Sequence, residues 1–120
     1  MDILTAACKV LNVDPDGYEV GFAFVSAAKI RELNKQFRGK DKVTDVLSFP
    51  DGDINPETGK KFLGDVLICK AEAKRRGMSI VLLQSHSILH LFGYDHETDA
   101  DYIKMCELQD EIIKYQNSHS

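Results

Sequence analysis

Cysteine is scarce in this sequence and its few copies are far apart. The 120 residues include three cysteines, Cys8, Cys69 and Cys106, each set among apolar neighbours. An odd number at wide spacing argues against a disulfide framework and against a cysteine zinc knuckle. We therefore expect these cysteines to be buried free thiols.

Long apolar runs are also missing. No stretch approaches the roughly 20 apolar residues that a helix needs to cross a bilayer. The first residues, MDILTAACKV, carry an acid where a signal peptide would carry basic residues. We expect a cytoplasmic protein with no membrane partner.

An overall excess of positive charge is absent as well, since the formal net charge is −4. The chain as a whole should not attract nucleic acid, but its charges are unevenly distributed. Residues 26–43 and 70–76 are basic, whereas residues 95–111 hold seven acids and one lysine. If the two basic segments converge in the fold, they form a local phosphate-binding face. Ordinary solvated helix faces would explain them equally well.

What the sequence contains is enough for one compact domain, which we expect to span residues 1–120, with 43% hydrophobic residues. Apolar spacing and capping residues predict helices and strands in alternation. The expected helices cover 3–12, 27–37, 70–76, 80–92 and a final segment from 99 onward; the expected strands cover 18–25, 44–49 and 62–69. This pattern predicts an α/β (α+β) fold with a small mixed sheet of three to four strands and helices packed around it.

Three of the four histidines crowd into the stretch SHSILHLFGYDHE. His86 and His90 are four residues apart on a predicted helix, so their side chains project from one face. Gly93 can end that helix in a left-handed conformation and let His96 fold back toward the pair. The pattern H-x-x-x-H-x-x-G-x-x-H has the ligand spacing of metzincin zinc proteases and predicts a metal site on this helix and the turn after it.

Three imidazoles form an incomplete tetrahedron, and zinc held this way typically keeps an open fourth position for catalysis. Metal-assisted hydrolysis is the predicted reaction class. Proteolysis is disfavoured, because Ser87 stands where the metzincin pattern has its general-base glutamate. A phosphodiester carries its own negative charge, and Arg38 with its lysine neighbours is a candidate for holding it.

Three motifs together resemble the YbeY endoribonucleases, also described as rRNA maturation factors. They are LNKQFRGKDKVTDVLSFP, LGDVLIC and HSILHLFGYDHE, in this order. The resemblance implies an α/β fold, one Zn²⁺ ion on His86, His90 and His96, and Arg38 near the metal, with these four residues as the catalytic set. It implies hydrolysis of single-stranded RNA in 16S rRNA 3′-end maturation and ribosome quality control, with rRNA and the small ribosomal subunit as partners. A ribosome-assembly binding factor with a structural or weakly catalytic zinc site is the alternative.

Some residues near these motifs have open roles. Asp45, Asp65 and Asp95 could orient the imidazoles, but capping and turn roles explain them equally well. Ser48 is expected to be a strand residue facing the cleft rather than a nucleophile, because no histidine remains to activate it. Ser87 stands where the resembling family usually has glycine, and its hydroxymethyl group would narrow the approach to the metal.

Overall fold

A computed structural model describes residues 1–119 of the chain. A three-stranded mixed sheet runs through it, formed by β1 (Tyr18–Phe24), β2 (Val46–Pro50) and β3 (Lys61–Ile68). The central strand is β3, which is parallel to β1 and antiparallel to β2. This confirms the small mixed sheet. Pro50, expected to stop the second strand, is its last residue instead, and a proline is tolerated there because β2 is an edge strand.

Five α-helices surround this sheet among the described residues, and each matches a helix expected from the sequence to within a few residues. They are α1 (Ile3–Leu11), α2 (Ala27–Arg38), α3 (Lys70–Arg75), α4 (Ile80–Leu91) and α5 (Asp99–Ser118). The caps explain where three of them begin. Ser26, Ser79 and Thr98 each accept a hydrogen bond from the backbone N–H three residues later, at 3.1, 3.3 and 3.1 Å.

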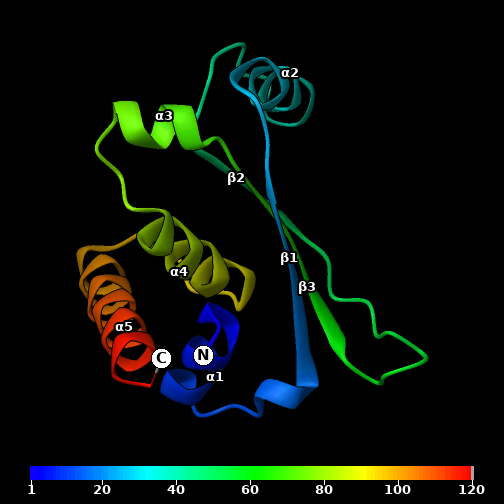
Figure 1. Cartoon of the computed structure of the whole chain (residues 1–120), viewed down its shortest axis with the longest axis vertical. Helices are drawn as coiled ribbons and strands as arrows, with labels where there is room; N and C mark the ends of the chain where they lie inside the picture. The colour runs from blue at the N-terminus through cyan, green and yellow to red at the C-terminus, as the bar shows by residue number, and fades with distance from the viewer. Residues whose placement is uncertain (120) are drawn as a thin grey trace.

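The helix α4 lies between the sheet and the pair formed by α1 and α5 (Figure 1). Ile88 and Leu89 pack with α1 and α5 in one apolar cluster, whereas Leu83 packs with Val66 and Ile68 of β3 in another. A helix that is apolar on nearly all sides is expected to be buried both on the side that faces the sheet and on the side that faces the other helices. The opposite end of the sheet is covered by α2, where Ile30 packs against Leu47.

One face of β1 is unevenly buried. Tyr18, Val20, Phe22 and Phe24 alternate along the strand and so share one face, but Phe24 is 51% exposed. The strand extends there beyond the helix α4, and the Phe24 ring is met by the Lys70 ammonium group, 4.0 Å from its centroid. The first three side chains are partly buried.

The cysteines are free thiols, as predicted, but they are not equally buried. Cys8 and Cys69 are enclosed, while Cys106 is only partly buried. Burial of Cys8, with smaller effects of Asp2 and Asp14, raises its pKa to about 11. Within residues 1–119, no helix has the length and apolar character to span a membrane.

Candidate metal centre and cationic cleft

The first two histidines of the candidate site occupy one face of α4. His86 and His90 are one turn apart, and their Nε2 atoms lie 2.9 Å from each other. Their rings meet edge to face with centroids 4.4 Å apart. Because Ile88 and Leu89 anchor the intervening turn in the core, this face of the helix is held in place.

The third histidine returns to the pair through a glycine turn. Gly93 has a φ of 101°, a backbone conformation that side-chain-bearing residues rarely adopt. The Tyr94 amide then donates to Leu89 O at 3.0 Å, which closes the helix and redirects the chain. His86, His90 and His96 each offer a ring nitrogen within 4.8 Å of the others and could hold a metal ion. The predicted convergence of the three residues is confirmed.

Two neighbours orient the imidazoles of the helix. The Nδ1 atom of His86 lies 2.7 Å from Oε1 of Gln109 on α5, and that of His90 lies 3.0 Å from the Tyr94 carbonyl oxygen. A carbonyl oxygen accepts only, so each Nδ1 carries a proton and each Nε2 presents its lone pair to the centre of the site, with the amide oriented accordingly. The two Nε2 atoms lie 2.9 Å apart, a spacing at which a shared proton or a metal ion offsets the repulsion between their lone pairs.

Sequence reasoning missed Gln109 and considered three aspartates as possible partners of the imidazoles. Asp45 pairs with Arg76 (3.6 Å), and the Asp95 carboxylate accepts from the Glu97 amide (3.4 Å) in a turn. Asp65 lies on β3 beside Gly21 of β1. None of these carboxylates has a hydrogen bond to a histidine in the described chain, so of the two roles left open by the sequence the turn and pairing contacts are the ones observed. A signal for Gln109 existed, because it is a polar residue within the buried stripe of α5.

The electrostatics of the site favour a neutral imidazole at His90. Burial of the ring lowers the pKa of His90, and repulsion by His86 and His96 lowers it further, against smaller opposing effects of the Tyr94 carbonyl and Asp95. A neutral imidazole is the form that binds metals.

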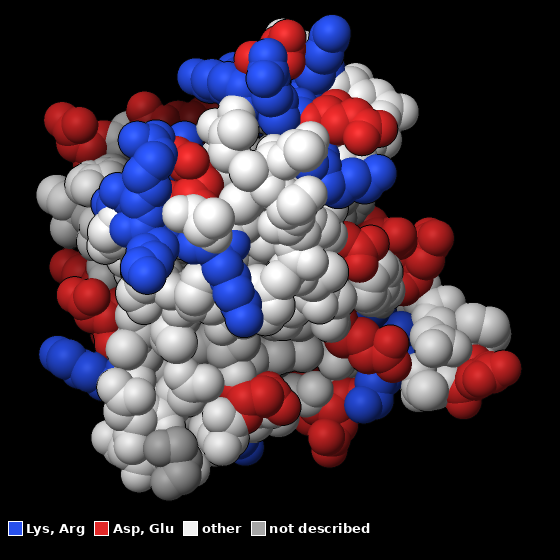
Figure 2. All heavy atoms as spheres, turned by 45° about the horizontal axis from the view of Figure 1, so that its top comes forward, with Lys and Arg blue, Asp and Glu red and all other residues white. Residues whose placement is uncertain are grey.

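A cleft of about 780 Å³ opens beside His86 and His90. Four cationic side chains line it: Arg38, Lys40 and Lys42 from the first basic segment and Arg76 from the second. The two segments therefore do converge, with lysines and arginines gathered over α2 and α3 around a largely uncharged surface (Figure 2). Other members of these segments are engaged elsewhere, since Arg31 pairs with Asp41 at 2.8 Å.

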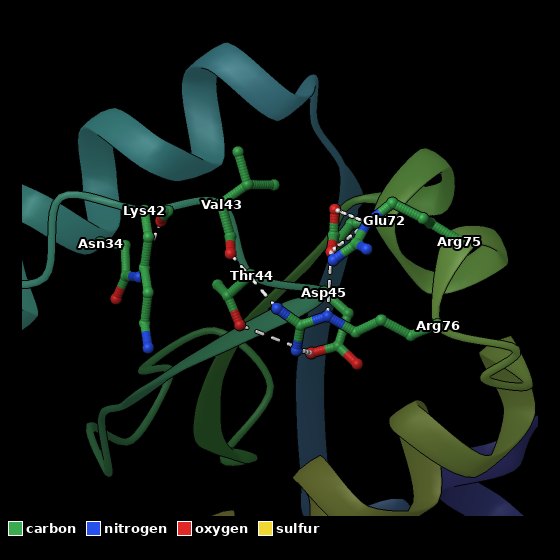
Figure 3. Close-up of polar contacts among 8 residues, drawn as sticks. All are labelled: Asn34, Lys42, Val43, Thr44, Asp45, Glu72, Arg75 and Arg76. Atoms are coloured by element: carbon green, nitrogen blue, oxygen red, sulfur yellow. Dashed lines mark hydrogen bonds and ion pairs between the residues drawn. The ribbon is translucent and has the colours of Figure 1, made fainter.

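The wall opposite the histidines comes from α2 and β2. Arg38, in the last turn of α2, donates from Nη2 to the Ser48 carbonyl oxygen at 2.7 Å, which fixes the guanidinium across the strand. Ser48 lines the cleft, as the sequence predicted. The loop between α2 and β2 is held by Asn34, only 3% exposed, whose side chain donates to the Lys42 carbonyl oxygen at 3.0 Å (Figure 3).

The end of α3 holds the same loop from its other side. Arg76 donates to the Val43 carbonyl oxygen (3.3 Å) and pairs with Asp45 and Glu72 at 3.6 and 3.0 Å (Figure 3). Hydrogen bonds from Arg75 and then Arg76 lower the pKa of Glu72 to about 2. This network, which the sequence did not predict, connects the loop between α2 and β2 to α3.

The cleft has no acidic wall. No carboxylate occurs among the described residues that line it, and Ser87 lies there with only 1% of its surface exposed. Ser87 stands where the metzincin pattern has its general-base glutamate. No acid from another described part of the cleft replaces that glutamate. The arrangement favours an anionic substrate over a peptide.

Comparison with known proteins agrees with the resemblance seen in the three sequence motifs. The family described as Endoribonuclease YbeY matches residues 1–117. Proteins named Endoribonuclease YbeY from Finegoldia magna and Persephonella marina are 40% and 42% identical to this chain; the alignments cover 89% and 87% of it and 74% and 72% of the relatives.

A solved structure has a related fold. The solution structure of TM1509 from Thermotoga maritima superimposes with a TM-score of 0.56 at 26% identity, covering 98% of this chain and 83% of that one. The arrangement of strands and helices therefore agrees with the sequence relationship. The chain belongs to the YbeY family of endoribonucleases.

Proposed function

We propose that this chain is a zinc-dependent endoribonuclease that cleaves single-stranded RNA, with His86, His90 and His96 as metal ligands and Arg38 bracing the phosphate. The observation that carries the proposal is the cleft, where four cationic side chains and no carboxylate of the described chain lie beside the histidine pair. RNA phosphates are the ligand that such a surface attracts.

The residues present fit a zinc ion. The donor set is three imidazoles, and two of them have Nδ1 engaged by an acceptor, which is the usual way in which a protein fixes the metal-binding nitrogen. The two Nε2 atoms, 2.9 Å apart, face the same point and can share one cation. Three protein ligands leave a position open for catalysis. When bound, zinc supplies Lewis acidity, polarising a phosphoryl oxygen and acidifying water.

The protein side chains position and neutralise the substrate. Arg38 uses one N–H for the Ser48 carbonyl oxygen and retains others for a phosphate, so its charge is presented in a fixed orientation. Lys40 and Lys42 form no ion pair among the described residues and are available for neighbouring phosphates. Arg38 would stabilise the additional negative charge of the transition state.

The biological setting follows from the family resemblance, which supports 16S rRNA 3′-end maturation and ribosome quality control in the cytoplasm, with the small ribosomal subunit as partner. A single strand is proposed because its backbone can follow a cationic groove while its bases turn outward. The metal is proposed as zinc because three imidazoles suit it.

Metal analysis and RNA cleavage together test this function. Protein purified without added metal should contain about one zinc per chain, lost in His86→Ala. On a fluorescent single-stranded RNA, His90→Ala and Arg38→Met should be at least about 100-fold slower than the unmodified protein, since each removes transition-state stabilisation. Lys114→Met, an exposed cation on α5 outside the cleft, is the matched control.

The same measurements separate the competing functions. Equal rates of RNA cleavage by the unmodified protein and His90→Ala would assign the activity to a contaminant and refute the proposal. Binding to small ribosomal subunits without any cleavage would establish the assembly-factor alternative. Cleavage of an unstructured protein instead of RNA would establish the protease.

A further inference from the structure

A second cavity adjoins the histidines on the side of α5. Its volume is about 370 Å³, and His86, His96 and Gln109 form one of its walls. Val46 and His86 line both this cavity and the cationic cleft, so the two are neighbours across these side chains. A molecule held by its phosphate in the cleft could extend a second group into this cavity.

The cavity differs from the cleft in chemistry. Its remaining walls are mostly apolar: Met78, Leu82, Leu83, Met105 and the partly buried Cys106. No lysine or arginine is found among the described residues that line it. Its acid, Asp45, is engaged by Arg76, and the Gln109 carbonyl oxygen is engaged by His86. The cavity therefore excludes a phosphate and suits an uncharged group with apolar faces.

The volume of the cavity and the exposed residue on its lining restrict further which chemical group it can hold. About 370 Å³ is near the lower end of the roughly 300–1,000 Å³ range of small-molecule sites, enough for one ring system and its substituents. Tyr102 of α5, also on the lining, is 59% exposed. Cys106, one turn further along α5, raises the pKa of Tyr102, and both side chains line the cavity. Aromatic rings beside methionine side chains are suitable surfaces for a flat base.

We propose that this cavity is a base pocket, which accepts one unstacked nucleobase of the RNA strand whose phosphate lies in the cleft. The inference rests on the proposed function and adds a specificity-determining site to it. Proteins recognise single-stranded RNA by turning bases out of the stack and placing them on aromatic or apolar side chains. A protein segment on the same apolar surface is the competing occupant.

Cys106 provides a direct probe of occupancy. Cys8 and Cys69 are 0% and 1% exposed, so an alkylating reagent should label Cys106 first. The zinc-loaded full chain is labelled in the presence of a short single-stranded oligonucleotide with 2′-O-methyl riboses, which cannot attack through the 2′-oxygen. At ten times its Kd, this oligonucleotide should slow labelling of Cys106 about tenfold. The same oligonucleotide without bases should bind at least about tenfold more weakly, because it lacks the stacked base, and at ten times its own Kd it should leave labelling unchanged.

The outcomes distinguish the pocket from the proposed function. Equal protection by the intact and abasic oligonucleotides would overturn the base pocket, because the backbone alone would then cover Cys106. Binding by fluorescence anisotropy without any protection of Cys106 would also overturn it, leaving the proposed function intact. If neither the intact nor the abasic oligonucleotide binds, both the base pocket and the proposed function would be overturned. Protection by a protein partner but not by the intact oligonucleotide would assign the surface to that partner.

Variants on α5 provide a second test with a matched control. Tyr102→Ala should raise KM for single-stranded RNA about tenfold, the effect of losing one stacked base, with kcat and zinc content unchanged. Tyr102→Phe keeps the ring and should retain the KM of the unmodified protein. Ile103→Ala removes a side chain of similar exposure, 57%, that does not line the cavity. Equal KM values for Tyr102→Ala and Ile103→Ala would contradict the pocket.

Discussion

Gln109 determines which nitrogen of His86 faces the candidate metal. Its amide oxygen, 2.7 Å from Nδ1, selects the imidazole form with a free Nε2, and the surrounding α5 residues keep the amide buried. A histidine without such an acceptor distributes its proton between both nitrogens and loses orientation. One glutamine on another helix therefore contributes to a site that the histidine pattern alone does not define.

Replacing Gln109 by leucine should weaken zinc binding by about 10–100-fold, because the acceptor for His86 is lost while the apolar volume is kept. Competition with a chromogenic chelator measures the affinity, and circular dichroism checks the fold. Gln116→Leu, the same change near the end of α5 where the side chain donates to the Met1 carbonyl oxygen, is the control. Equal zinc affinities in the two variants would remove Gln109 from the site.

At the scale of elements, α3 and the loop before β2 form one unit through the Glu72 carboxylate. The pKa of this group falls from an ordinary value of 4.5 to about 2 in the folded chain, chiefly through Arg75 and then Arg76. Since the folded pKa is the lower one, the ionised carboxylate stabilises the fold above about pH 4.5. That contribution is lost as the pH falls from 4.5 toward 2.

The pH dependence of thermal unfolding tests this linkage. Glu72→Gln should lower Tm at pH 7, and its difference from the unmodified protein should shrink as the pH falls below 4.5 toward 2. The titration of other groups is common to both proteins and cancels in the comparison. Glu57→Gln, in an exposed turn where the backbone N–H makes the hydrogen bond, should show little difference at any pH. A Tm difference for Glu72→Gln that is constant with pH would contradict the role.

Elements with a local signature were the ones that sequence predicted well. The starts of α2, α4 and α5 follow from Ser26, Ser79 and Thr98, whose hydroxyl groups cap the helix within three residues. The histidine triad is equally local, since it spans eleven residues with a glycine turn. The contacts of Gln109 with His86 and of Arg76 with Val43 join residues 23 and 33 positions apart. Such pairings depend on helix packing, which periodicity does not specify.

The aspartates illustrate the same limit. A carboxylate is a common partner of a metal-binding histidine, so Asp45 was a reasonable candidate by residue type. In the fold, however, β2 places Asp45 toward α3, where Arg76 pairs with it. Residue type gave the chemistry and tertiary structure chose the partner. The single domain over residues 1–120 and the catalytic roles of the site residues remain predictions.

At the scale of the whole molecule, net charge and local charge point in opposite directions. The chain carries −4 overall, yet Arg38, Lys40, Lys42 and Arg76 share one cleft. Single-stranded RNA should therefore bind through a limited number of phosphate contacts rather than through a uniformly attractive surface. The acidic start of α5, with Asp99 and Asp101, should repel the phosphates of the strand, so only an uncharged base is expected to approach that side of the molecule.

The salt dependence of RNA binding measures the number of contacts. Arg76 is already paired with Asp45 and Glu72. With Arg38, Lys40 and Lys42 engaged, a plot of log K against log salt should have a slope of about −2, given roughly −0.7 per phosphate for single strands. Lys40→Ala/Lys42→Ala should reduce the slope by about 1.4. Fluorescence anisotropy with the 2′-O-methyl oligonucleotide avoids cleavage during the titration.

The control for this titration keeps the total charge change equal. Lys9→Ala/Lys114→Ala removes two exposed cations from α1 and α5, outside the cleft. Its slope should match that of the unmodified protein. If both double variants reduce the slope equally, binding reflects the total charge and the cleft has no special part in it.

The position of α4 between two apolar clusters affects how a bound ion could leave. His86 and His90 move only if a helix packed on both sides moves, whereas His96 is exposed and follows a glycine with a φ of 101°. Two of the three imidazoles therefore belong to a helix that is packed on both sides, and the third belongs to the exposed segment after Gly93. Exchange of the ion with solution would begin at His96, and His86 and His90 would stay in place on α4 for the next ion.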